Sequence, residues 1–276
     1  MTLADAIAAA AARGLDRLDA QLLLLHLLGR AYTDRAWLLA HDTELLAASA
    51  QAAFLELCER RARQEPLAYI VGHKEFFGLD LHVDKRVLVP RPETEIVVEW
   101  ALELIPDDGH SLRVVDLGCG SGAIALAIKR ARPHVPVDAV DCSEGALEVA
   151  TANARRLSLE VNFAQACWLA ASDRRYDLIV ANPPYVAEAD PHLAALRHEP
   201  LLALAAGRDG LREIRAISGQ AAAHLRPGGW LLLEHGWDQA ESVRGLLAAA
   251  GLQHVATRRD LAGIERCSGG KSPELG

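Results

Sequence analysis

The amino-acid sequence predicts an α/β fold: a parallel sheet covered by helices on both faces, with a small helical domain before it. From Arg113 onward, short apolar runs alternate with glycine turns and helical stretches, a pattern typical of parallel strands joined by crossover helices. Before the sheet, residues 1 to about 62 repeat Leu and Ala at helical spacing. The length of 276 residues exceeds that of most single compact domains, which favours two domains.

Residues 1–65 are predicted to form a helical bundle that serves as a recognition or support domain. Asp19 and Asp42 can cap its helices, and Gly14 and Gly29 punctuate them. Because this segment carries no group of catalytic side chains, its apolar faces are interpreted as core.

Residues 66–90 are predicted to be a β-hairpin linker between the domains. The runs Leu67–Gly72 and Phe76–Val83 are short, alternating and punctuated by glycine, as in paired strands. Beyond the linker, Pro92 suits the first turn of a helix expected over residues 93–104.

Residues 91–276 are predicted to form the domain that contains the sheet. Its expected strands and helices are strands 113–117, 137–141, 177–181 and 229–234, and helices 122–131, 144–157 and 211–225. The segment Arg226–Gly229 is expected to be a turn that leads into the last strand, and residues 268–276 are expected to be frayed.

The composition favours a small-molecule or protein substrate over a nucleic acid. The formal net charge is −8, whereas proteins that grip a nucleic-acid backbone usually carry a basic face. The five cysteines form no CxxC pair, so neither a disulfide framework nor a zinc site is expected. Neither a signal peptide nor a membrane span is expected, and a reducing cytoplasm is the expected location.

A glycine-rich turn after the first strand is the expected cofactor site. The segment Gly118-Cys119-Gly120-Ser121-Gly122 lets a ligand approach the backbone, and the helix that follows offers unpaired N–H groups. Asp116, at the end of the strand, is placed to accept a hydrogen bond from the ammonium of a methionine moiety. The Gly-x-Gly-x-Gly spacing differs from that of dinucleotide binders, and alone it also fits any tight strand-to-helix turn.

Asp141 ends the second strand, about twenty residues beyond the glycine turn, where an acidic residue can accept both ribose hydroxyls of an adenosine. The alternative is that Asp141 caps the helix that begins near Glu144, a role for which Ser143 is also placed.

The segment Asn182-Pro183-Pro184-Tyr185 is the most specific signal in the chain. Its prolines fix φ and have no N–H, so the carbonyl of Pro183 is rigidly presented. Asn182 can accept one hydrogen and Tyr185 can offer an aromatic face. Two acceptors suit a planar –NH2 group, because they point its lone pair towards a sulfonium methyl. Asn182, Pro183 and Tyr185 are therefore the predicted catalytic residues, with no metal and no covalent nucleophile.

With these motifs in this order, the chain resembles the class I methyltransferases that modify amide or amino nitrogens. Further segments make it similar to the release-factor glutamine N5-methyltransferases in particular, and the resemblance reaches about Arg266. These segments are Pro66–Gly72, Phe76–Leu79, Pro90–Glu95, His198–Pro200, Leu232–Gly236 and Arg259–Gly263.

The resemblance implies a Rossmann-like class I methyltransferase sheet and S-adenosylmethionine as cofactor, with S-adenosylhomocysteine as product and no metal. It implies that the substrate is the glutamine of the Gly-Gly-Gln motif in class 1 peptide-chain release factors, held with help from the helical N-terminal domain. No direct nucleic-acid or membrane partner is expected. Cofactor contacts carry over to Gly118–Gly122, Asp141, Trp168 and Asn182, and substrate contacts to Asn182, Pro183, Pro184 and Tyr185.

The chain departs from the family pattern in two places. The family commonly has Ser-Asp-Trp where this chain has Ala166-Cys167-Trp168, so the acidic residue expected to bind the adenine amino group is missing. Trp168 either covers the adenine face or is an ordinary buried tryptophan. Near the C-terminus, Cys267–Gly270 replaces the expected apolar strand.

Two interpretations stay open. The same clamp on an –NH2 group suits an adenine-N6 or guanine-N2 methyltransferase acting on DNA or RNA, which would need a base-flipping pocket and basic groove residues. The basic cluster Arg60-Arg61-x-Arg63 is interpreted as a solvated helix end. The segment Pro90–Glu95 either lines the pocket, with Thr94 and Glu95 facing the polar end of the cofactor, or stabilises the joint between the domains.

Overall fold

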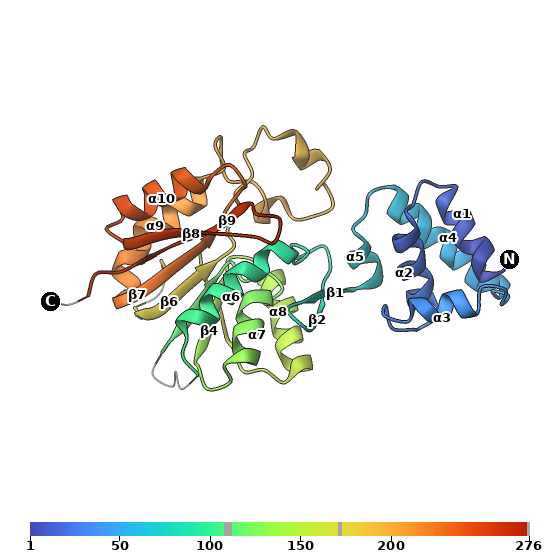
Figure 1. Cartoon of the computed structure of the whole chain (residues 1–276), viewed down its shortest axis with the longest axis horizontal. Helices are drawn as coiled ribbons and strands as arrows, with labels where there is room; N and C mark the ends of the chain where they lie inside the picture. The colour runs from blue at the N-terminus through green and yellow to red at the C-terminus, as the bar shows by residue number, and fades with distance from the viewer. Residues whose placement is uncertain (108–111, 171–172, 275–276) are drawn as a thin grey trace. The chain divides into compact units, whose positions relative to one another are not determined.

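The computed structural model describes residues 1–107, 112–170 and 173–274. The chain forms two compact units, Met1–His73 and Lys74–Gly276 (Figure 1). The separate linker at residues 66–90 that the sequence suggests stays a prediction. None of the helices in the described residues is long and apolar enough to cross a membrane.

The first unit is a bundle of short helices. They are α1 (Leu3–Ala11), α2 (Arg17–Leu27), α3 (Arg35–Ala40), α4 (Ala48–Ala62) and α5 (Leu67–Val71). Leucines of α2 pack with Phe54 of α4 in a fully buried core. The N-cap of α2 is Asp16, not Asp19 as the sequence suggested, because Asp16 accepts a hydrogen bond from the Asp19 N–H. The Asp19 carboxylate instead pairs with Arg61 of α4 at 2.5 Å.

The run Leu67–Gly72 is helical, so its interpretation as one strand of a hairpin was wrong. It buries Ile70 against the core of the bundle, and Gly72 ends it with a φ of 81°. The hairpin is shorter than expected and consists of β1 (His73–Phe76) and β2 (Leu79–His82). Local alternation could not reveal the helix, because it is the burial of Ile70 in the bundle that stabilises a single helical turn.

The second unit contains a seven-stranded sheet in the order β5-β4-β3-β6-β7-β9-β8 (Figure 1). Its strands are β3 (Val114–Leu117), β4 (Val137–Asp141), β5 (Asn162–Gln165), β6 (Tyr176–Ala181), β7 (Leu225–Glu234), β8 (Gln253–Arg259) and β9 (Glu265–Lys271). Strands β3 to β7 pair in parallel, and β9 is antiparallel to both of its neighbours. The predicted α/β class is therefore confirmed.

Helices cover both faces of this sheet (Figure 1). One face carries α6 (Glu95–Leu104), α7 (Ala123–Ala131) and α8 (Glu144–Leu157), and the other carries α9 (Arg212–His224) and α10 (Ala240–Ala249). Short 3-10 turns, η1 (Pro92–Thr94), η2 (Pro191–Ala194) and η3 (Leu201–Ala203), belong to the loops outside the sheet. The inner parallel strands β3, β4 and β6 are almost wholly buried, as a two-sided cover requires, whereas the edge strand β5 is mostly exposed.

The C-terminal part of the sheet differs from the prediction of a frayed end. Residues 268–271 belong to β9, and Ser268–Gly270 are buried. A Cβ on Gly269 would lie 2.5 Å from Leu232 Cδ2, so only glycine lets β9 lie this close to β7. Residues 275–276 lie outside the described part of the chain. A strand built from small residues lacks the apolar alternation by which strands are recognised.

The predicted turn at Arg226–Gly229 lies inside β7 as an irregularity. Leu225 pairs with Tyr176 and Trp230 pairs with Leu178, so the residues between them bulge opposite Asp177. The bulge delivers the apolar run that follows it into the buried sheet, as the sequence suggested.

Candidate active site

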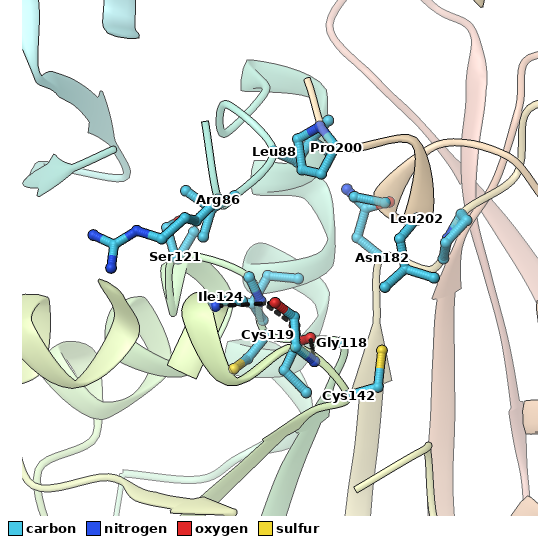
Figure 2. Close-up of a pocket in the computed structure, with 18 of the residues that line it drawn as sticks. Arg86, Leu88, Gly118, Cys119, Ser121, Ile124, Cys142, Asn182, Pro200 and Leu202 are labelled. Atoms are coloured by element: carbon cyan, nitrogen blue, oxygen red, sulfur yellow. Dashed lines mark hydrogen bonds between the residues drawn. The ribbon is translucent and has the colours of Figure 1, made fainter. Parts of the chain in front are cut away.

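A cavity of about 370 Å³ opens at the carboxyl ends of β3, β4 and β6 (Figure 2). In the strand order, β4 lies on one side of β3 and β6 lies on the other. This is the point at which the chain switches direction across the sheet, where open α/β sheets generally bind their ligands. The location agrees with the sites predicted after these strands.

The glycine turn forms the floor of the cavity. Gly118 and Gly120 line it and have φ values of 71° and 54°, which an L side chain rarely adopts. A Cβ on Gly118 would lie 3.1 Å from Cζ3 of Trp168, so glycine also admits the indole ring here. Gly122, at the N-cap of α7, lies behind the lining, where an added Cβ would meet Leu126 at 3.0 Å.

Asp141 lines the cavity at the end of β4. One carboxylate oxygen accepts from the Gly120 N–H and the other from the Ser143 N–H, both at 2.9 Å. Ser143, rather than Asp141, caps α8 through a bond from the Ala146 N–H. Asp141 therefore ties the glycine turn to β4, and its remaining lone pairs are available for ribose hydroxyls.

Asp116 lies outside the lining of the cavity. Its side chain is buried, one oxygen accepts from the Ala125 N–H at 3.1 Å, and the other has no hydrogen-bond partner. Burial, together with the charge of Asp141, raises the pKa of the Asp116 carboxyl to about 7. The contact of Asp116 with a cofactor ammonium stays a prediction.

Asn182 follows β6 and lines the cavity (Figure 2). Its Nδ2 donates to Thr94 Oγ1 at 3.0 Å. With the amide nitrogen engaged in this way, the side-chain oxygen Oδ1 is the atom left to accept a hydrogen bond from a ligand. Thr94 is itself 4% exposed, so the bond is shielded from water.

A buried carboxyl, Glu234, lies beside the Asn-Pro-Pro-Tyr segment. It accepts from the Tyr185 hydroxyl at 3.3 Å, and the hydroxyl of Thr94, which accepts from Asn182, acts on it by lowering its pKa. The Glu234 side chain is 1% exposed and its Oε2 has no hydrogen-bond partner. Burial raises its pKa to about 7, and burial also raises the pKa of Tyr185, which therefore stays a donor. Glu234 thus positions Tyr185, and Thr94 positions Asn182.

The raised pKa of Glu234 should make the stability of the protein depend on pH. The unfolded chain releases this proton near the ordinary glutamate pKa of 4.5, whereas the folded protein keeps it until about pH 7. The folded state therefore binds more protons in this window, and the free energy of unfolding falls as the pH rises through it. Glu234→Gln removes the titration, so the variant should gain on the order of 3 kcal/mol relative to the parent across the window.

Urea unfolding of both proteins at pH 5 and pH 8 measures this difference. Asp116, a second buried acid whose pKa is raised, is present in both proteins and cancels in the comparison. If the difference in the free energy of unfolding between the two proteins is the same at pH 5 and pH 8, the assignment is contradicted.

Part of the segment Pro90–Glu95 lines the cavity, through Pro90, Arg91 and Thr94. Glu95 is not in the lining and accepts from the N–H of Phe77 in the hairpin at 3.0 Å. A role of the segment in the joint between the domains stays a prediction. The buried Glu199 connects the start of this segment and the residue before it to the loop that contains η2 and η3. Its carboxylate accepts from the Val89 N–H at 3.1 Å and pairs with Arg91 at 2.5 Å.

Trp168 lines the cavity with a φ of 55°, and its Nε1 donates to Glu213 of α9 at 3.0 Å. It is half-buried, so it is not an ordinary core tryptophan. The predicted site residues that line the cavity are Gly118, Cys119, Gly120, Ser121, Asp141, Trp168, Asn182 and Pro184. Those that do not are Asp116, Gly122, Pro183 and Tyr185.

The ring of Tyr185 packs against the core between the sheet and α9. Its role in presenting an aromatic face to a substrate therefore stays a prediction. Sequence reasoning missed Glu213 and Glu234, although a glutamate that ends a buried apolar strand was a signal for the second. Within the described ranges, no cluster of three or more His, Cys, Asp or Glu side chains could hold a metal ion.

Comparison with known proteins assigns the chain to a family. The model of the PrmC N-terminal domain matches residues 2–72, and that of the methyltransferase small domain matches residues 98–208. A release factor glutamine methyltransferase from Xylella fastidiosa is 49% identical, covering 97% of this chain and 98% of that protein. The chain belongs to the release factor glutamine methyltransferase family. One from Bordetella pertussis is also 49% identical, over 93% of this chain and 95% of that protein.

Membership in the release factor glutamine methyltransferase family confirms the predicted enzyme class, transfer of a methyl group from S-adenosylmethionine. It does not favour the alternative of a nucleic-acid base methyltransferase. A solved methyltransferase structure from Pyrococcus furiosus has a TM-score of 0.55 at 19% identity, covering 79% of this chain and 98% of that one. That likeness supports the fold alone.

Proposed function

We propose that the chain methylates the side-chain amide nitrogen N5 of the glutamine in the Gly-Gly-Gln motif of class 1 peptide-chain release factors. The observation that carries the proposal is the orientation of Asn182. Its amide nitrogen is held by Thr94 and its side chain lines the cavity, which leaves its oxygen as the acceptor for an amide hydrogen. The relatives of high identity bear the name of this activity.

The cavity residues fit S-adenosylmethionine, which supplies a methyl group on a positively charged sulfur. Gly118 and Gly120 leave the floor free of side chains, so the backbone can approach the cofactor. Asp141 accepts the ribose hydroxyls, and the indole of Trp168 offers a flat apolar face.

On the substrate side, Asn182 Oδ1 and the backbone carbonyl of Pro183 accept the two hydrogens of the glutamine amide. An amide nitrogen is a weak nucleophile because its lone pair is delocalised, so alignment with the sulfonium methyl provides most of the help. S-adenosylmethionine would supply the methyl group and remain as S-adenosylhomocysteine, and the amide would lose one proton to solvent while Asn182 and Pro183 hold it. No chain residue has to form a covalent intermediate.

The helical N-terminal unit is proposed to help hold the release factor. The segment 2–72 matches a domain model that belongs to this family, and the unit folds around its own core. The net charge of −8 suits a protein partner better than a nucleic-acid backbone. A cytoplasmic location and the lack of a metal are part of the proposal.

The test supplies radiolabelled S-adenosylmethionine with a purified release factor, and in parallel with total DNA and with rRNA. We expect label in the release factor, and none when its Gly-Gly-Gln glutamine is replaced by alanine. Label in DNA or rRNA without label in the release factor would overturn the proposal. Label in the alanine-substituted release factor would show that the methylated residue is another one.

A further inference from the structure

The adenine side of the cavity lies where β4 and β5 end. These strands pair in parallel with Asp141 opposite Gln165, so the loops that follow them share one edge of the sheet. Both loops line the cavity, through Cys142 on one side and Ala166–Trp168 on the other. If Asp141 holds the ribose, as the proposed function has it, the attached base extends between these loops.

The side chains of Cys142 and Ala166–Trp168 provide no strong acceptor for the exocyclic amino group of adenine. Cys142 and Cys167 are weak acceptors, Ala166 has no polar side-chain atom, and the indole of Trp168 only donates. Ser143 also lines the cavity, and its hydroxyl oxygen is used to cap α8. A charged side-chain acceptor that distinguishes the base from its 6-oxo counterpart therefore has to come from another element.

Glu213 lines the same cavity from the first turn of α9. Its side chain is 18% exposed. One carboxylate oxygen accepts from Trp168 Nε1 at 3.0 Å, and the other accepts from Arg212 Nε at 2.7 Å. Each carboxylate oxygen has a second lone pair, so the pair of bonds orients the group without exhausting it.

We propose that Glu213 recognises the amino group of the adenine ring and replaces the acidic residue that the loop after β5 lacks. Trp168 and Arg212 each donate to one oxygen of the carboxylate, which lines the cavity and is 18% exposed. The indole abuts the glycine turn, so the same contact fixes the wall along which the base lies.

The negative charge of Glu213 also acts on Cys142, in the loop after β4. The pKa of the Cys142 thiol is raised, first by burial and then by negative charges that include Asp141 and Glu213. The Glu213 charge therefore acts across the space between the loops. A carboxylate in that position attracts an amino group and repels a carbonyl oxygen.

The experiment compares two ligands by calorimetry, S-adenosylhomocysteine and S-inosylhomocysteine, which carries a carbonyl oxygen in place of the amino group. The parent protein should bind the adenine ligand about ten- to a hundredfold more tightly. In Glu213→Gln this ratio should fall to within about threefold, because an amide can accept or donate. Thermal unfolding checks that the variant remains folded.

A control variant keeps the carboxylate at position 213. Glu188→Gln removes another carboxylate, which lies 3.6 Å from Arg212. This variant should retain the preference for adenine. If Glu213→Gln weakens both ligands equally and leaves their ratio unchanged, Glu213 only positions Trp168 and the proposal is overturned.

The result also separates this inference from the proposed function on which it rests. Failure of the parent protein to bind S-adenosylhomocysteine at all would contradict the proposed function. Binding with no preference between the ligands would contradict only the role of Glu213.

Discussion

Asn182→Ala is expected to lower kcat for glutamine methylation by about a hundred- to a thousandfold, the usual effect of removing one preorganised polar contact to a transition state. Without Oδ1, one amide hydrogen has no acceptor and the nitrogen lone pair is no longer aligned with the methyl group. The affinity for S-adenosylhomocysteine should change by less than about threefold, because Asp141 and the glycine turn hold that ligand. Single-turnover kinetics and calorimetry measure the two effects separately.

A matched control is Asn162→Ala, which removes an asparagine of β5 that bonds to Asp138 outside the cavity. It should leave kcat unchanged. Thr94→Val should give an intermediate loss, since Asn182 keeps its oxygen but loses the partner that orients it. Turnover by Asn182→Ala close to that of the parent would rule out the amide clamp.

Asp141→Ala should weaken binding of S-adenosylhomocysteine by about a hundredfold or more, since hydrogen bonds to a charged group contribute about 1.5–3 kcal/mol each. The substitution removes the acceptor of the ribose hydroxyls and also the bonds that hold Gly120 and Ser143. Calorimetry at saturating protein concentration gives the affinity. Affinity equal to that of the parent would refute the ribose assignment.

A second ligand separates the ribose contact from damage to the glycine turn. A 2′-deoxy analogue should bind the parent more weakly than S-adenosylhomocysteine does, because it lacks one of the hydroxyls. In Asp141→Ala the two ligands should bind alike if the hydroxyl contact was made by Asp141. A penalty for the 2′-deoxy analogue that persists in the variant would assign the hydroxyl contact to another residue.

The parts of the site that sequence reasoning found are those where a strand and its functional residue are adjacent in the chain. Asp141 and Asn182 each directly end or follow a buried apolar run, and a parallel sheet brings such positions to one edge. Glu234 and Glu213 come from other elements. Pairing of β6 with β7 sets Ala181 opposite Leu233, which places Glu234 beside Asn182, and only that register reveals it.

The errors in the fold have a similar cause. Leu67–Val71 is too short for periodicity to separate a helix from a strand, and burial of Ile70 in the bundle decided between them. Strand β9 has no apolar alternation because its glycines pass against the side chains of β7. In both places, contacts with distant residues override the local pattern.

The two bonds of Glu199 also affect the stage of folding at which the cavity forms. This carboxylate joins the segment that contains Val89 to a loop 110 residues later in the chain. The glycine turn and Asp141 precede that loop in the chain. A growing polypeptide therefore contains the floor of the cavity well before the wall that the loop contributes through Pro200, Leu202 and Ala203. Closing a contact over so long a separation is slow compared with forming local turns. We therefore expect newly made chains to gain tight cofactor binding late, when the wall closes, rather than when the glycine turn forms.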